Sequence, residues 1–182
     1  MANNDNPRGF WPASPITPIS VLLKTNETVA VGDAVFPDGA NGMTIALADS
    51  DVIWNGGVVA PQENASGTFI SQQGANVFTT SSAGQMVEIY PFLDPATLTP
   101  NRFRGQVSGS SSTGMLRNLY DIVGGTGAME VDQGGTVAEY VVMVTDIYDG
   151  DLVNHDSSGR VVANEVGAAG VVEFIVPPLR AA

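Results

Sequence analysis

The sequence predicts an all-β protein, built as a compact β-barrel or β-sandwich, and three observations support that class. The 182 residues include 21 glycines and 11 prolines, which favour tight turns and oppose long helices. Only 14% of the residues are charged, against about 25% in an average soluble domain, and lysine occurs once, at Lys24. Short apolar runs rich in Val and Ile recur between clusters of turn residues. The length fits one domain with a real core.

The first segment, residues 1–18, is expected to form an extended arm, because its four prolines oppose helix and cannot donate ladder hydrogen bonds. The arm carries Phe10 and Trp11, followed by Pro12. Two adjacent aromatic side chains would be costly to leave in water, so they are expected to dock on the core of this chain or on a neighbouring chain. Phe10, Trp11 and Pro12 are therefore candidate contact residues.

The body, residues 19–176, is expected to consist of strands joined by turns, with at most one short helix. Residues 136–147 are the most apolar run and are expected to form a central strand. Segments 62–74 and 94–100 are polar or turn-rich and are expected to be loops, and residues 177–182 form a short tail after Pro177. The other strands are predicted at 19–24, 29–31, 34–36, 43–48, 52–60, 76–80, 85–92, 151–154, 159–163 and 171–176.

The one short helix is expected between Ser112 and Gly124, where a possible N-cap and a stop residue bracket an apolar series. Its apolar residues have the spacing of one helical face: Met115, Leu116, Leu119, Ile122 and Val123. The preceding Gly109–Gly114 looks like a phosphate-binding loop, but Met115 occupies the position where that motif needs lysine. The sequence therefore gives no nucleotide site.

The net charge of −12 disfavours direct binding to nucleic acid or to an anionic membrane surface. Eight acids and no Lys or Arg lie between Asn118 and Gly159, and this region is interpreted as a solvated acidic face. The opposite charge gathers at Arg102, Arg104 and Arg117. The start of the sequence lacks the pattern of a signal peptide, and no apolar run approaches the roughly 18 residues of a membrane span.

No residues carry an enzymatic signature, and no catalytic residue, cofactor or metal site is expected. Cysteine is absent, and His155 is interpreted as a turn histidine because the adjacent Asp156 and Ser157 cannot both face it as in a catalytic triad. Oxygen donors suited to Ca²⁺ gather between Asp146 and Asp156, but their spacing does not match an EF-hand loop. They are interpreted as turn residues, and whether this loop binds a cation stays open.

Several short segments, taken in order, carry a family resemblance. These segments are Asn6–Pro12, Gly32–Val35, Ile45–Ala48, Ile53–Val59, Val87–Pro95 and Val137–Ile147. With these segments in this order, the chain resembles the head decoration, or cement, proteins of tailed bacteriophages.

This resemblance implies a β-barrel or β-sandwich that sits on the outer surface of the virion capsid. Its partner would be the major capsid protein, whose neighbouring subunits it joins, and it would act as a homotrimer made in the host cytoplasm. Phe10, Trp11 and Pro12 would then contact the capsid or another subunit. The alternative is a head-fibre or tail-associated protein that binds host-surface glycan, which exposed aromatic side chains on body loops would favour. Turnover of a glycan or peptide would indicate a hydrolase instead.

Overall fold

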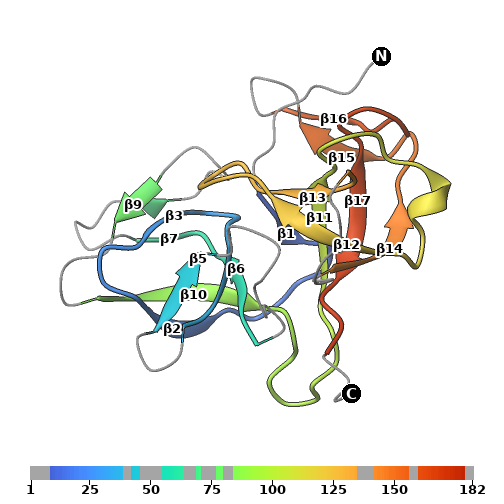
Figure 1. Cartoon of the computed structure of the whole chain (residues 1–182). Coiled ribbons are helices and arrows are strands. Elements are labelled where there is room, and N and C mark those ends of the chain that lie inside the picture. Colours follow the sequence, from blue (N-terminus) through green and yellow to red (C-terminus); the bar gives the residue numbers. More distant parts are fainter. Residues whose placement is uncertain are drawn as a thin grey trace.

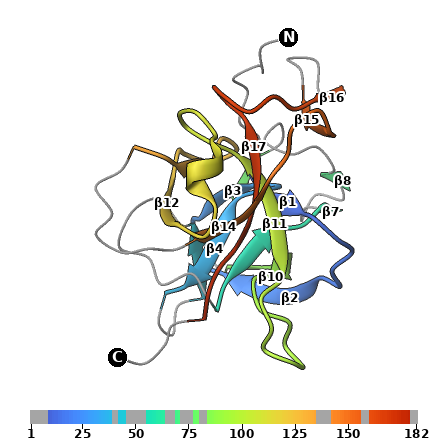
Figure 2. The ribbon, with the colours of Figure 1, turned by 90° about the vertical axis from the view of Figure 1, so that its right-hand side faces the viewer.

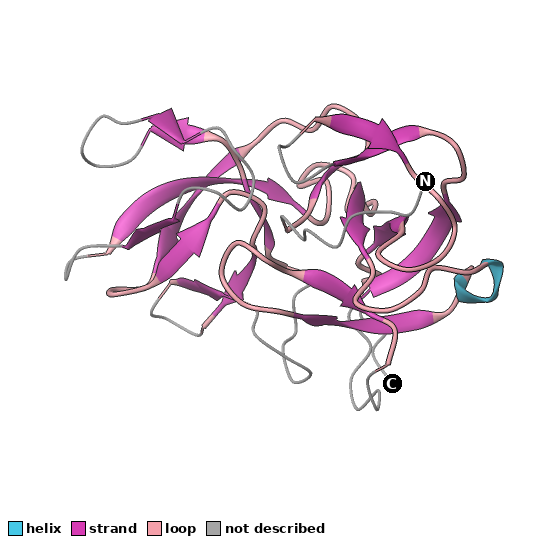
Figure 3. Ribbon diagram, turned by 90° about the horizontal axis from the view of Figure 1, so that it is seen from above, coloured by secondary structure: helices cyan, strands magenta, loops and turns pink. Residues whose placement is uncertain are grey.

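The computed structural model describes residues 9–38, 42–45, 55–63, 69–70, 77–79, 84–134, 142–155 and 160–178. Across these residues the protein is all-β, which confirms the predicted fold class (Figure 1). The helical element of the described chain is a single 3-10 turn, η2 (Thr113–Met115), drawn in cyan in Figure 3.

Five strands close into a small barrel whose order around the barrel is β10-β2-β5-β4-β6. All neighbouring pairs are antiparallel except β2 and β5, which run parallel. Strand β10 is long enough to pair with β2 through its first half and with β6 through its second half, which lets one strand close the barrel. The strands are β2 (Ile19–Leu23), β4 (Ala34–Pro37), β5 (Met43–Ile45), β6 (Gly57–Val59) and β10 (Gln85–Pro91).

A six-stranded sheet, mostly from the second half of the chain, packs beside the barrel with the order β1-β11-β17-β14-β12-β13. Its last strand curls back toward β11, because Val131 forms a bridge with Val107 and accepts the Ser108 N–H at 3.0 Å. Figure 2 shows β11 and β17 running side by side. The strands are β1 (Trp11–Pro12), β11 (Arg102–Gln106), β12 (Leu119–Val123), β13 (Glu130–Asp132), β14 (Val142–Ile147) and β17 (Val171–Ile175).

Three two-stranded ribbons complete the described fold. One of them, the β15–β16 hairpin, lies beside the six-stranded sheet, near β17 in Figure 1. The ribbons are β3 (Thr28–Ala30) with β9 (Val77–Thr79), β7 (Gln62–Glu63) with β8 (Phe69–Ile70), and β15 (Leu152–His155) with β16 (Val161–Ala163).

One hydrophobic core serves both the barrel and the sheet, because buried side chains from both belong to a single cluster. Four phenylalanine rings run through it. Phe92 lies edge-on to Phe103 with ring centroids 5.2 Å apart, Phe103 stacks on Phe174 at 6.2 Å, and Phe10 lies edge-on to Phe174 at 4.9 Å. Edge-on and offset aromatic pairs add stabilisation beyond the area they bury.

The core contains Phe10, so residues 9–18 are not a separate arm. Phe10 is 1% exposed, its N–H donates to the Gly32 carbonyl at 2.7 Å, and β1 pairs antiparallel with β11. Gly9 is needed for this approach, since a Cβ there would lie 2.5 Å from the Gly32 oxygen. Of the two docking sites that the sequence left open for Phe10, the structure shows the core of its own chain.

Asp33 joins the barrel side of the molecule to the six-stranded sheet. Its carboxylate is fully buried and accepts two backbone N–H groups at 2.7 Å, from Ala30 in β3 and from Gly127 in the loop between β12 and β13. Next to it, the Ala34 N–H points at the Met129 sulfur at 3.1 Å. Burial raises the pKa of Asp33 from 3.8 to about 6, although the two backbone hydrogen bonds act in the opposite direction.

Several local predictions were wrong. The segment expected to be a helix forms only the turn η2, and Leu119–Val123 is strand β12. Within the expected loop 62–74, Gln62–Glu63 pairs with Phe69–Ile70. Strands β11 and β13 were not predicted. Residues 46–48, 52–54 and 136–141, which are parts of predicted strands, lie outside the described residues.

Replacing Phe10 with Ala is expected to lower the free energy of unfolding by about 3–5 kcal/mol, because it empties a buried aromatic site. Chemical denaturation of both proteins measures the change. The variant Trp11→Ala is the matched control, since Trp11 is only partly buried and its loss should have a smaller effect. Equal stabilities of parent and Phe10→Ala would show that Phe10 does not complete this core.

Asp33 predicts a specific pH dependence of stability. The folded state binds the proton of Asp33 more tightly than the unfolded state. Protonated Asp33 therefore contributes to the free energy of unfolding; this contribution is fully present below about pH 4 and is lost as pH rises through about 6. The variant Asp33→Asn cannot titrate, and it offers one oxygen to two N–H donors. Its stability deficit relative to the parent should therefore shrink by about 3 kcal/mol between about pH 4 and 7.

Denaturation curves across this pH range measure the deficit. Asp94→Asn is the control, because the carboxylate of Asp94 is exposed and backbone hydrogen bonds from Thr97 and Ala96 lower its pKa. The contribution of Asp94 to stability is lost only as the pH falls below the ordinary pKa range of an aspartate. The stability difference between Asp94→Asn and the parent should therefore stay constant between about pH 4 and 7. A level deficit for Asp33→Asn as well would contradict the prediction.

Candidate functional site

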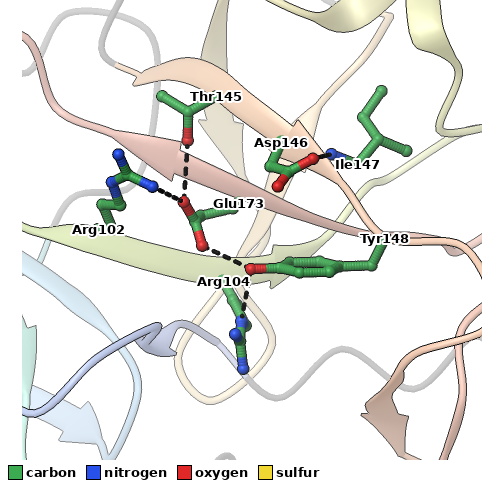
Figure 4. Close-up of polar contacts among 7 residues, drawn as sticks. All are labelled: Arg102, Arg104, Thr145, Asp146, Ile147, Tyr148 and Glu173. Carbon is green, nitrogen blue, oxygen red and sulfur yellow. Dashed lines mark hydrogen bonds and ion pairs between the residues drawn. The ribbon is translucent and has the colours of Figure 1, made fainter.

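The strongest grouping of polar and aromatic side chains lies on the face of the six-stranded sheet that points away from the core, here called the outer sheet face. Along β11, β14 and β17 its residues alternate with the core residues Phe103, Val144 and Phe174. The outer sheet face is defined by Trp11, Arg102, Arg104, Thr145, Tyr148 and Glu173, and Figure 4 shows all of these except Trp11.

Glu173 is the centre of this group. Its side chain is only 6% exposed, and three donors reach its carboxylate: Arg102 Nη1 at 3.1 Å, Thr145 Oγ1 at 3.4 Å and Tyr148 Oη at 2.5 Å (Figure 4). A buried carboxylate needs this compensation, since an unpaired one would be strongly destabilising. Glu173 is therefore engaged within the fold.

Arg104 and Tyr148 extend the group toward β1. Arg104 Nε donates to Tyr148 Oη at 3.1 Å, and the guanidinium carbon lies 4.7 Å from the centre of the Tyr148 ring. Burial, together with the hydrogen bond to Glu173, raises the pKa of Tyr148, so the phenol stays protonated and can donate. The result is a chain of charge-assisted contacts that holds both arginines on one surface.

The sequence-predicted residue Trp11 lies at the edge of this surface. In β1, Trp11 is paired with Arg104, and Pro12 is paired with Phe103. Paired residues of antiparallel strands project to the same face, so Trp11 is on the face of Arg104. Trp11 and Pro12 are partly exposed, whereas Phe10 is in the core. Of the three candidate contact residues, Trp11 and Pro12 remain accessible to a partner.

A buried chain of amides holds the β15–β16 hairpin against the sheet. Gln106 Nε2 donates to Asn154 Oδ1 at 2.8 Å, and Asn154 Nδ2 donates to Asn164 Oδ1 at 3.2 Å. Asn164 also donates to the Tyr148 and Val171 carbonyls and accepts the Val171 N–H. The hairpin is therefore fixed to β11 and β17, next to the outer sheet face.

This amide chain involves the segment Asp146–Asp156, for which the sequence left open whether it binds a cation. Asn154 is occupied inside the fold, and the Asp146 carboxylate accepts the N–H of its neighbour Ile147 at 2.8 Å. Among the residues that the structure describes, no group of three or more His, Asp or Glu side chains could hold a metal ion. Asp156 and Ser157 lie outside those residues.

Three interpretations of charged residues need correction. His155 is the last residue of β15, opposite Val161, and not a turn residue. Asp121 is 4% exposed, so the acids after Asn118 are not all solvated. Arg102 and Arg104 come together on β11, whereas Arg117 lies in the turn before β12 with φ of 63°.

The sequence reasoning missed Glu173 and Tyr148. Glu173 did carry a signal, since it is the one charged residue in the apolar run Val171–Val176. A charge inside a buried strand needs a partner, which Arg102 provides from a position 71 residues earlier. No comparable signal marks Tyr148.

Comparison with family models, with curated proteins and with solved structures finds no match for this chain. In the described residues, no helix is long and apolar enough to cross a membrane.

Replacing Tyr148 with Phe is expected to lower the free energy of unfolding by about 1–3 kcal/mol, because a largely buried carboxylate loses one of its donors. Urea denaturation measures the change. Tyr120→Phe is the matched control, since Tyr120 lies on β12 and makes none of these contacts. If both variants lose the same stability, the Tyr148 hydroxyl does not support the group.

Proposed function

We propose that this chain is a structural protein that binds the outside of a tailed-phage head and stabilises contacts between major capsid subunits. The observation that carries the proposal is a contact between two of the segments on which the family resemblance rests. Gly9 and Phe10 lie directly against Gly32, at the N–H to carbonyl distance of 2.7 Å. Segments that are separate in the sequence thus form one structural unit, as expected if the segments of the resemblance belong to a common body.

The outer sheet face supports a role in binding a protein partner. Its carboxylate is held by donors of the same chain, while the Arg102 side chain is 64% exposed and Trp11 is partly exposed beside Arg104. Trp and Arg are enriched among the residues that dominate protein interfaces. A surface of this composition suits contact with a capsid subunit, and the proposed role requires no catalysis.

The distribution of aromatic side chains favours capsid attachment over glycan binding. Where the structure describes an aromatic side chain, it is buried or partly buried, and the large apolar side chains that are well exposed are all aliphatic. A glycan-binding surface would be expected to present aromatic rings on body loops. We further propose that the protein assembles as a homotrimer on the virion surface, as the family resemblance implies. Its low charge density leaves apolar side chains exposed, which favours self-association.

The variant Trp11→Ala tests the proposed function. Its affinity for heads assembled from the major capsid protein of the same virus should fall about 30-fold, as expected for loss of an anchor aromatic worth about 2 kcal/mol. Co-sedimentation over a range of protein concentrations measures the affinity. Deletion of residues 1–18 is unsuitable, because it also removes Phe10 from the core.

Leu116→Ala is the control, since Leu116 is 39% exposed and follows η2, away from β1 in the sequence. Both variants must first show cooperative unfolding. Equal binding of Trp11→Ala and the parent would exclude Trp11 as an anchor. Failure of the parent to co-sediment with heads, together with retention on immobilised host-surface glycan, would favour the alternative function.

A further inference from the structure

Arg102 and Arg104 each use one nitrogen within the fold, which leaves part of each guanidinium group for a partner. Arg102 donates from Nη1 to Glu173, and Arg104 donates from Nε to Tyr148. Among the described residues, nothing accepts a hydrogen bond from Nε or Nη2 of Arg102, or from the two terminal nitrogens of Arg104. Figure 4 shows the two guanidinium groups on different sides of the Glu173 carboxylate. Each arginine therefore keeps one pair of parallel N–H groups, which is the geometry that holds both oxygens of a carboxylate.

The ion pairs leave this part of the surface positive. Within the described residues, Glu173 is the only carboxylate that pairs with either arginine, and its one negative charge cannot balance two positive charges. Asp146 is exposed and is paired with Glu173, but it lies on β14, on the side of Glu173 away from Arg104. The part of the outer sheet face over β1 and β11 therefore attracts a negatively charged group.

Both guanidinium groups are held in place before a partner arrives. Arg104 lies 4.7 Å from the centre of the Tyr148 ring, and Arg102 is bonded at 3.1 Å to Glu173, whose side chain is largely buried. A side chain that is already fixed loses little entropy on binding. Because the two arginines are two residues apart on β11, they project to the same face with about 6.5–7 Å between their Cα atoms.

Partly exposed apolar side chains surround the arginines. Ile175 is paired with Arg102, Met143 is paired with Ile175, and Trp11 is paired with Arg104. Paired residues share a face of the sheet. A partner that covers this surface therefore buries apolar area around the ion pairs, and the exclusion of water strengthens them.

We propose that the outer sheet face binds an extended protein segment that carries two acidic residues separated by one residue. In such a segment the two acidic side chains point the same way at an interval of about 6.5–7 Å, which matches the interval between Arg102 and Arg104. One carboxylate binds Nε and Nη2 of Arg102, and the other binds the terminal nitrogens of Arg104. The inference rests on the proposed function, since it names the chemistry of the capsid segment that this surface would meet.

The net charge of −12 restricts where an acidic segment can bind. Distant charges repel the segment, but salt screens them, with a Debye length of about 8 Å at 0.15 M ionic strength. Ion pairs in direct contact and partly buried are screened much less. An acidic segment is therefore held where arginine donors are available, and the surrounding charge opposes other contacts.

Two isomeric peptides test the spacing. Both are short, blocked and fluorescently labelled chains of Thr and Val with two Glu. A single residue separates the two Glu in the first peptide, and the two are adjacent in the second. Their charge is the same, so the protein repels them equally at long range. Fluorescence anisotropy in about 0.15 M salt should show about tenfold tighter binding of the first peptide, because the second can place only one carboxylate on the arginines.

The variant Arg102→Gln tests the assignment to these side chains. It keeps a donor for Glu173 but removes the charge, so it should lose the preference between the two peptides and bind heads about tenfold more weakly than the parent. Arg117→Gln is the matched control, since Arg117 is exposed in the turn before β12 and its loss changes the net charge equally. It should retain both properties. Unfolding midpoints show whether both variants fold, and if Arg102→Gln does not, the two peptides on the parent decide.

Equal binding of the two peptides to the parent, or an unchanged preference in Arg102→Gln, would overturn the proposal. Sedimentation velocity tests for a different occupant. If Arg102→Gln converts an assembled parent into monomers, the occupant is a second copy, and the acidic partner segment is excluded.

These results are distinguishable from the test of the proposed function. A peptide preference in a parent that does not bind heads would retain the acidic specificity and remove the capsid role. Head binding that depends on Trp11, together with equal binding of the two peptides, would retain the capsid role and remove this inference.

Discussion

The Asp33 carboxylate is the contact on which the relative position of the two halves of the protein depends. Asp33 directly precedes the barrel strand β4; one of its oxygens accepts the N–H of Ala30 at the end of β3, and the other accepts the N–H of Gly127 in the loop between the sheet strands β12 and β13. Both donors would otherwise be buried polar groups, which are costly when unpaired. The neighbouring Gly32 carbonyl accepts the N–H of Phe10, so strand β1, which follows Phe10, is attached beside Asp33. Trp11 reaches the outer sheet face because Phe10 is fixed there.

Much of the fold could be predicted from local sequence patterns, and particular residues show why. In β10, Val87 and Ile89 are buried while Met86 and Glu88 are exposed, which is the alternation expected of a half-buried strand. The same reasoning failed at β12, because its apolar residues also match helical spacing. What decides the strand is pairing with β13 and β14, which come later in the chain. In β11, Gly105 weakens the local strand signal, yet a Cβ there would lie 2.5 Å from the Phe10 ring.

The candidate site was less predictable than the fold, because its members come from distant segments. Trp11 could be identified, since a large aromatic residue in a proline-rich segment needs a surface to contact. Its neighbour Phe10 gives the same local signal but is buried, and only the position of Phe174 distinguishes the two. Asp33 looks like an ordinary turn residue in the sequence. Its burial depends on Gly127, which lies 94 residues later, and no local pattern contains that information.

The packing of Phe10 against Phe174 has a consequence for the order of folding. A ring near the start of the chain completes its contacts only with a strand near residue 174, and such non-local contacts slow folding. During synthesis the ribosome releases the barrel segments first, while the sheet that covers them is still being made. The rings of Phe10 and Phe103, which pack against Phe174, then lack this partner until β17 emerges. Slower translation of the last third of the chain should therefore lengthen the period in which aggregation competes with folding.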